Sequence, residues 1–269
     1  MKIENMSFLN LLKLYHSTYR LVYKANPGNA GDGVIAAATY DFMESNSLKY
    51  EQFRFGEAYS NTKDVLIFGG GGNLIEGLYS EGRDFLSDNI KNFAKVIIMP
   101  STIKGYEDFF TINKESLIVC AREEITFNSL LGLGYEKDTN LILAHDMAFY
   151  LDKSKYINSI IPFKGEVKCF RTDNESLDKQ WKDNNHDISL TWNGDYWDNQ
   201  YLARSSTECL ISFLQQYSVI STDRLHIAIL GSLLDKEVNF YPNSYYKNQA
   251  VYNNSLINLY PKTYFISPL

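Results

Sequence analysis

Five short apolar runs in the first half of the chain constrain its fold most strongly. They are Leu21–Tyr23, Val65–Phe68, Val96–Met99, Leu117–Cys120 and Leu141–Ala144. Runs of this kind that alternate with helical stretches are typical of buried parallel strands, because a helix returns the chain to the same edge of the sheet. We expect helices to open near Asp32 and Glu123, and a turn at residues 100–102. The pattern predicts an α/β fold with a doubly wound parallel sheet.

A second α/β unit is predicted after the polar stretch Lys153–Pro162. Strands are expected at Val219–Ile220 and Val238–Tyr241, with a helix at Leu225–Leu234 between them, and further strands in GEVKCFRTDNES and HDISLTWNG. We therefore divide the chain into an N-terminal domain, residues 1–152, and a C-terminal domain, residues 153–269. We leave open the alternative that the end of the chain, from about residue 255, packs back on the first domain. Two Rossmann-like domains would then face a cleft, where open α/β sheets bind ligands.

Charge and hydropathy exclude several classes of protein. The 269 residues carry a net charge of −6 and contain no Lys/Arg-rich run, which argues against a nucleic-acid partner. No apolar stretch is long enough to span a membrane, and the N-terminus lacks the apolar core of a signal peptide, so we expect a cytoplasmic protein. The apolar face formed by Phe8, Leu11, Leu12 and Tyr15 indicates a helix that packs into the core or lies on a membrane surface.

The cysteines give no indication of a metal or a disulfide framework. Cys120, Cys169 and Cys209 are far apart in the chain, and each lies within an apolar run. Neither a C-x-x-C pair nor a His/Cys cluster is present, and the number of cysteines is odd. We expect three buried thiols in a reducing compartment, and no metal site.

Two glycine-rich segments are candidates for the walls of a ligand cleft. The first is PGNAGD, with candidate residues Asn29 and Asp32, and the second is GGGGN, with Gly70, Gly71, Gly72 and Asn73. Glycine permits tight turns and close approach to the backbone, and the N–H groups at a helix start attract anions. The alternatives are that Asp32 only caps a helix and that the glycine run is only flexible. Neither segment matches a dinucleotide or P-loop motif.

Arginine and histidine residues follow the predicted strands. Arg122 and Arg171 each come after an apolar strand, and Asp223, Arg224 and His226 open the helix in TDRLHIAILG. A guanidinium binds carboxylate or phosphate with two parallel hydrogen bonds, and an imidazole exchanges a proton near neutral pH. Arg122 has the alternative of a structural ion pair with the adjacent glutamates. The carboxylates of Asp146, Asp173 and Asp223 are candidates to orient His226 or to share its role as a base.

Eight segments, taken in chain order, carry a resemblance to a known family. They are NPGNAGD, LIFGGGGNLIEGLY, IIMPSTI, CAREE, HDMAF, FRTDNES, STDRLHIAILG and YPNSYYKNQAVYNNSL. Together they resemble the polysaccharide pyruvyl transferase family over most of the chain. Two positions depart from the family pattern, since Ser101 stands where glutamine is common and His145 where proline is common. The second departure argues that His145 is not catalytic. His16, His145 and His186 lack the neighbouring arginine that accompanies His226, so we treat all three as structural residues.

The resemblance implies a fold similar to GT-B glycosyltransferases and a reaction in which phosphoenolpyruvate gives pyruvate as a ketal to two hydroxyls of a sugar. The sugar would belong to an exopolysaccharide, a capsule or a cell-wall polymer. It implies donor contacts by Arg171, Arg224, Leu225, His226, Lys247 and Arg122, and cleft or acceptor contacts by Ser101, Asp146, Asp173, Asn243 and Tyr245 together with the glycine-rich segments. His226, Arg224 and Asp223 would be the catalytic residues.

The expected partners are phosphoenolpyruvate as co-substrate and a sugar acceptor, with a lipid-linked oligosaccharide at the inner face of the membrane as one form of it. Peripheral membrane contact is therefore a further expectation. We expect no cofactor. Two alternatives remain open, a GT-B glycosyltransferase that uses a nucleotide sugar and a non-catalytic subunit of a polysaccharide assembly complex.

Overall fold

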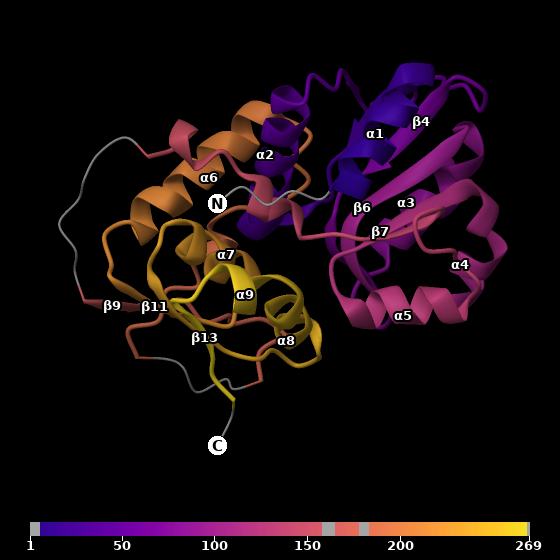
Figure 1. Cartoon of the computed structure of the whole chain (residues 1–269). Coiled ribbons are helices and arrows are strands. Elements are labelled where there is room, and N and C mark those ends of the chain that lie inside the picture. Colours follow the sequence, from indigo (N-terminus) through magenta and orange to yellow (C-terminus); the bar gives the residue numbers. More distant parts are fainter. Residues whose placement is uncertain (1–5, 158–164, 178–182, 268–269) are drawn as a thin grey trace. The chain divides into compact units, whose positions relative to one another are not determined.

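The computed structural model describes residues 6–157, 165–177 and 183–267 (Figure 1). It has a mixed α/β fold with a large parallel sheet flanked by helices. The chain divides into two compact units: the first comprises Met1–Asn26 with Thr39–Tyr150, and the second Pro27–Ala38 with Leu151–Leu269. Helix α2, Ala30–Ser45, belongs to both units.

The first unit is built on the large sheet. Its strands run in the order β3 (Glu51–Gln52), β1 (Arg20–Lys24), β4 (Asp64–Phe68), β6 (Lys95–Lys104), β7 (Leu117–Ala121) and β8 (Leu141–Leu143), and β5 (Gly71–Ile75) also pairs with β6. All of these pairings are parallel. The helices of this unit are α1 (Met6–Thr18), α3 (Glu81–Asn89), α4 (Glu107–Ile112) and α5 (Glu124–Gly132). The five predicted strands and the helix near Glu123 are confirmed.

The turn predicted at residues 100–102 is wrong, because β6 continues through them to Lys104. The ladder between β6 and β7 shifts register between Ile98 and Ser101. Such an irregularity accommodates Pro100, which has no N–H to donate, without ending the strand.

The apolar runs of the sheet form the core of this unit. Its strand residues Val22, Leu66, Val96 and Val119 are completely buried. Helix α1 contributes Phe8 and Leu12, which are also completely buried, and the Phe8 ring stacks on Phe42 with centroids 5.4 Å apart. The face of α1 therefore packs into the core. Over the part of the chain that the structure describes, no helix is long and apolar enough to cross a membrane.

The second unit contains a smaller parallel sheet. Its order is β13 (Thr263–Phe265), β12 (Glu237–Phe240), β11 (Val219–Thr222) and β9 (Glu166–Lys168), while β2 (Gly28–Asn29) pairs antiparallel with β10 (Asn193–Gly194). Its helices are α6 (Gln200–Leu214), α7 (Leu225–Leu233), α8 (Lys247–Val251), a π-helical segment (Tyr252–Leu256) and α9 (Ile257–Leu259). Strand β13 joins this sheet, so the pairing gives no support to the option that the chain end packs on the first domain.

Two other predictions differ from the structure. The HDISLTWNG segment forms a 3-10 helix, Ile188–Thr191, and the two-residue β10 rather than a regular strand, and helix α6 was not predicted. Cys120 and Cys169 are buried as expected, but Cys209 on α6 is exposed. The predicted linker begins with a 3-10 turn, Lys153–Lys155, and its residues 158–162 lie outside the described part of the chain.

The glycine run of the first unit packs against the protein's own backbone. The Gly69 N–H donates to the Lys24 carbonyl at 2.8 Å, and the Asn26 amide donates to the carbonyls of Gly69 and Gly70. A Cβ at Gly70 would lie 2.6 Å from the carbonyl oxygen of Pro100. The run is therefore explained by close contact between adjacent segments.

Replacing Gly70 by alanine is expected to lower the free energy of unfolding by about 1–3 kcal/mol, because the new methyl group meets rigid backbone. The matched control is Gly132→Ala at the end of α5, where a Cβ meets nothing within 4 Å. That variant should match or exceed the stability of the parent. Urea unfolding of the two variants measures the difference, and equal stability would contradict the close contact at Gly70.

Candidate active site

The carboxyl ends of two neighbouring strands bring Arg171 and Arg224 together in the second unit. Strands β9 and β11 pair in parallel, with Val219 opposite Glu166 and Ser221 opposite Lys168. Arg171 follows β9 after two residues, and Arg224 follows β11 and caps the start of α7. Parallel strands end at the same sheet edge, which is why arginines far apart in the sequence become neighbours.

Arg171 is almost completely buried and is held by two carboxylates. Its Nε and Nη2 atoms donate to Asp173 at 2.7 and 3.0 Å, and its Nη2 atom lies 2.9 Å from Glu175. Although burial opposes ionisation, the hydrogen bond to Asp173 and the neighbouring negative charges raise the pKa of this guanidinium. Arg171 therefore remains charged in its buried position.

Arg224 shares one of these carboxylates. Its Nε and Nη2 atoms donate to Asp187 at 2.8 and 2.6 Å, and its Nη1 atom lies 2.8 Å from the same Asp173 that binds Arg171. Burial raises the pKa of Asp173, but the hydrogen bond from Arg171 and the charge of Arg224 outweigh it, so the pKa stays below its usual value. Asp173 is thus an ionised bridge between the two guanidinium groups.

The predicted residues Asn243, Tyr245 and Lys247 also belong to this network. The Nζ atom of Lys247 donates to Glu175 at 2.5 Å, and the Asn243 amide donates to the same oxygen at 3.0 Å. The Lys247 ammonium lies 5.1 Å from the centre of the Tyr245 ring, within the range of a cation–π contact. Residues from the loop before α8 therefore join those that follow β9.

The salt bridges of this cluster balance in charge. Among the described residues, the three cations Arg171, Arg224 and Lys247 pair with the three carboxylates Asp173, Glu175 and Asp187. The side chain of Asp173 is 31% exposed, whereas those of Glu175 and Asp187 are 4% and 7% exposed. Asp173 is therefore the partner that a ligand anion could replace with the least loss of packing.

Asp223 occupies the turn between β11 and α7. It accepts a hydrogen bond from the backbone N–H of Arg171 at 2.7 Å, and the amide of Asn248 donates to its carbonyl at 2.7 Å. Burial raises the pKa of Asp223 to about 6, although the Arg171 N–H and the charges of Arg171 and Arg224 oppose the shift. A carboxyl group with this pKa exchanges a proton near neutral pH.

His226 lies in the first turn of α7 and contacts the PGNAGD turn, which belongs to the same unit. A Cβ at Gly31 would lie 2.5 Å from the Nδ1 atom of His226, so only glycine fits against the imidazole. The Asn29 side chain accepts from the Gly31 N–H at 2.8 Å at the start of α2. The helix predicted to open near Asp32 is confirmed, but the alternative that Asp32 caps it is wrong, because α2 begins at Ala30 and Asp32 lies within its first turn.

Of the remaining predicted site residues, Leu225 is buried as the first residue of α7 in the second unit, and the others belong to the first unit. Arg122 is buried, with its Nη1 atom 2.6 Å from Asp146 and its Nε atom 2.9 Å from the Thr102 hydroxyl. These contacts support the alternative of a structural ion pair for Arg122, with the carboxylate of Asp146 as a partner. Ser101 is buried and donates to the Met99 carbonyl. Gly70 precedes strand β5, which contains Gly71, Gly72 and Asn73.

Three residues of the network were not predicted from the sequence. Glu175 is two residues after Asp173, and Asn248 follows Lys247, so the polar residues around these two predicted positions would have suggested them. Asp187 lies in the HDISL segment, whose irregular structure gives no periodic signal. No group of three or more His, Cys, Asp or Glu residues within 6–157, 165–177 and 183–267 could hold a metal ion.

The raised pKa of Asp223 predicts a specific dependence of stability on pH. The unfolded carboxyl titrates near pH 4 and the folded one at about 6, so in between the folded protein binds more protons. The stability that Asp223 contributes is therefore complete below pH 4 and is lost as the pH rises through 6. Relative to the parent, Asp223→Asn should gain on the order of 2 kcal/mol between about pH 4.5 and 7.5.

Chemical denaturation at the two pH values measures this difference. The exposed Asp88→Asn substitution on α3 is the matched control and should show no such change. A difference between Asp223→Asn and the parent that is the same at both pH values would show that the carboxyl does not titrate in this range.

Comparison with known proteins adds to this geometry. The family model of polysaccharide pyruvyl transferase matches residues 29–245. The crystal structure of a functionally uncharacterised protein from Klebsiella pneumoniae subsp. pneumoniae NTUH-K2044 is similar, with 61% sequence identity, a TM-score of 0.94, and coverage of 99% of this chain and 100% of that chain. A search of curated proteins gave no match. The extent of the family match, with Asn29, Arg171 and Arg224 inside it, shows that the chain belongs to the polysaccharide pyruvyl transferase family.

Proposed function

We propose that this protein transfers pyruvate from phosphoenolpyruvate, as a ketal, to two hydroxyls of a sugar in polysaccharide biosynthesis. The observation that carries the proposal is the pair of buried arginines bridged by Asp173. Two guanidinium groups that share one carboxylate could also donate several hydrogen bonds to a ligand anion with several oxygens. Phosphoenolpyruvate is such an anion, since it carries a carboxylate and a phosphate.

The donor would bind by replacing Asp173. Its side chain is the most exposed carboxylate of the cluster, and its removal would leave hydrogen-bond donors of Arg171 and Arg224 for the substrate. Lys247 adds a positive charge near Arg171, because both side chains pair with Glu175. Each charge-assisted hydrogen bond contributes roughly 1.5–3 kcal/mol, which is enough for an acidic protein to bind a multiply charged ligand.

The chemistry needs a proton at the methylene carbon of the donor. In our proposal His226 gives that proton, so the methylene becomes a methyl group and positive charge develops at the neighbouring carbon. A sugar hydroxyl bonds to this carbon, the bond to the phosphate oxygen breaks, and a second hydroxyl closes the ketal. One hydroxyl proton restores His226 and the other leaves on the phosphate. Asp223, with a pKa of about 6, would share the role of proton acceptor.

The wider setting belongs to the same proposal. We place the donor on the C-terminal domain, residues 153–269, and the acceptor at the PGNAGD turn of residues 1–152, which packs against Trp197 and His226 in the second unit. A GT-B-like fold of two Rossmann-like domains belongs to the same proposal. A lipid-linked oligosaccharide at the cytoplasmic face of the membrane would be one form of the acceptor. The reaction written above balances without a cofactor. The contact between the PGNAGD turn and His226 supports a link between the acceptor-side turn and the proton donor.

Ligand-dependent thermal unfolding tests the donor without knowledge of the acceptor. Phosphoenolpyruvate at about 100 times its Kd should stabilise the parent by about 2.7 kcal/mol. Arg224→Lys keeps the charge but loses the planar fork, so it should bind phosphoenolpyruvate at least about tenfold more weakly. His226→Gln should bind it normally but release phosphate on the order of a hundredfold more slowly with a suitable acceptor. Stabilisation by uridine or guanosine diphosphate sugars instead would favour a glycosyltransferase.

Replacing Asp173 tests whether this carboxylate occupies the donor site. Asp173→Asn removes a competing negative charge from both arginines, so the Kd for phosphoenolpyruvate should fall about tenfold in calorimetric titration. The control is Asp235→Asn, which removes an exposed carboxylate paired with Lys262 in the same unit. Weaker binding by Asp173→Asn than by the control would mean that Asp173 holds the two arginines in place for the donor and does not occupy the donor's position.

A further inference from the structure

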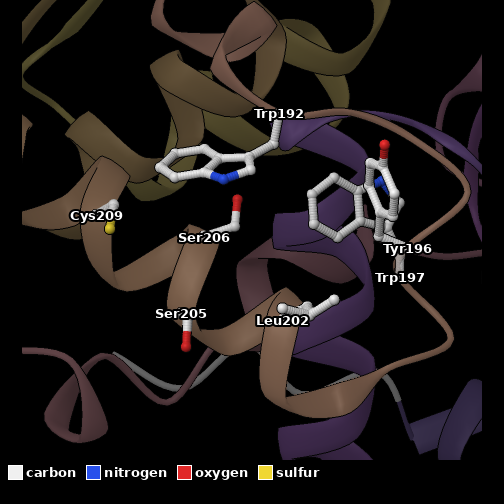
Figure 2. A pocket seen from close by; sticks show the side chains of 7 residues that line it. All are labelled: Trp192, Tyr196, Trp197, Leu202, Ser205, Ser206 and Cys209. Carbon is white, nitrogen blue, oxygen red and sulfur yellow. The ribbon is translucent and has the colours of Figure 1, made fainter.

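A hollow of about 100 Å³ lies in the second unit beside helix α6 (Figure 2). Its lining residues come from two elements: Trp192, Tyr196 and Trp197 from the segment before the helix, and Leu202, Ser205, Ser206 and Cys209 from the helix itself. The helical residues recur at the spacing of one face, so α6 presents a single side to the hollow. We call this hollow the aromatic pocket.

Trp197 fixes one wall of the aromatic pocket. Its side chain is 1% exposed, and its Nε1–H donates to the Gly28 carbonyl at 3.1 Å. A Cβ at Gly33 would lie 3.0 Å from the indole ring, so glycine lets the ring pack directly on α2. The Tyr196 ring meets Trp197 edge-on, with centroids 6.0 Å apart. This wall is therefore rigid and needs no ordering when a ligand binds.

The chemistry of the lining is neutral and partly polar. None of the seven lining residues is charged, so the pocket is unsuited to phosphoenolpyruvate or a nucleotide phosphate. Ser206 is 3% exposed, and its hydroxyl has no hydrogen-bond partner among the described residues. Figure 2 shows this hydroxyl directed toward the indole of Trp192. Because a buried hydroxyl without a partner is costly, a ligand with its own hydroxyl groups would be favoured here over a hydrocarbon.

The PGNAGD turn connects the aromatic pocket with the candidate active site. Gly28 accepts from Trp197, and Gly31 packs on the imidazole of His226 three residues later. Both contacts lie within the second unit. The same short turn therefore contacts both the wall of the aromatic pocket and the residue proposed to transfer the proton.

We propose that the aromatic pocket binds one neutral pyranose ring of the acceptor saccharide. The apolar C–H face of the ring stacks on the aromatic side chains, and Ser206 exchanges hydrogen bonds with a ring hydroxyl. A cavity of about 150 Å³ encloses a benzene molecule. The aromatic pocket, with a volume of about 100 Å³, therefore has room for part of one sugar ring and not for a longer chain. This inference rests on the proposed function, because it names the site of that reaction's acceptor.

Cys209 provides a reporter that does not depend on catalysis. It is exposed and lines the pocket, whereas Cys120 and Cys169 are buried and burial raises the pKa of the Cys169 thiol to about 12. N-ethylmaleimide should therefore modify Cys209 selectively. We would measure this rate by mass spectrometry with methyl β-galactopyranoside, methyl α-mannopyranoside and methyl N-acetyl-β-glucosaminide in turn. A glycoside at ten times its Kd should slow the modification about tenfold, because about nine-tenths of the pockets are filled.

Sorbitol and cyclohexanol separate the contributions of ring and hydroxyls. Neither should protect Cys209 as well as the best glycoside does, since one lacks the flat ring and the other lacks the hydroxyl pattern. Equal protection by either compound, or no protection by any glycoside, would overturn the inference. These results leave the proposed donor site untouched, because phosphoenolpyruvate binding is measured separately.

Two variants locate the binding contacts. Trp192→Ala removes a partly exposed ring and should abolish protection, and Ser206→Ala should weaken glycoside binding about two- to tenfold without loss of thermal stability. Ser212→Ala, at an exposed hydroxyl of the same helix, is the matched control and should bind as the parent does. All three should keep the parent Kd for phosphoenolpyruvate. Unchanged glycoside binding in Trp192→Ala and Ser206→Ala would contradict the assignment, and loss of phosphoenolpyruvate stabilisation in the parent would instead contradict the proposed function.

Discussion

The carboxylate of Asp173 between Arg171 and Arg224 is the interaction on which the candidate site depends. Two buried guanidinium groups so close together would repel each other strongly in a medium of low dielectric. Asp173, Glu175 and Asp187 compensate them, and they tie the ends of β9 and β11 to Lys247 at the start of α8. The positive charge needed for an anionic donor is thus kept inside the fold, already paired.

This pairing shows how a protein with a net charge of −6 can concentrate positive charge in one place, as the proposed anion site requires. The charges of the cluster are local and buried, so the overall charge says little about them. In the proposed function, donor binding is an exchange of anions, because the carboxylate of Asp173 leaves as the donor arrives. In the first unit, by contrast, Arg122 and Asp146 form a buried pair whose 1% and 0% exposed side chains leave no comparable route for a ligand.

The PGNAGD turn has a second role in this arrangement. Glycine is needed at Gly31 in this turn and at Gly33 just after it, because the imidazole of His226 and the indole of Trp197 pack on the backbone there. The turn belongs to the unit that contains the arginines, although it lies far from them in the sequence. The aromatic pocket and the charged cluster therefore belong to one unit, which suits the two substrates of the proposed reaction.

The sequence by itself determined five strands of the first sheet, though not β3 or β5, together with the order of the motifs and the family. It did so because buried parallel strands leave continuous apolar runs and the motifs stand at their ends. It also identified Arg171, Arg224 and Lys247 as residues of one site. Only the tertiary structure decided that Asp187 and Glu175 neutralise them, that Arg122 has a structural partner, and that α6 and Trp197 form a pocket. Ion pairs and pocket walls join residues distant in the chain, and neither residue periodicity nor local spacing records which distant side chains meet.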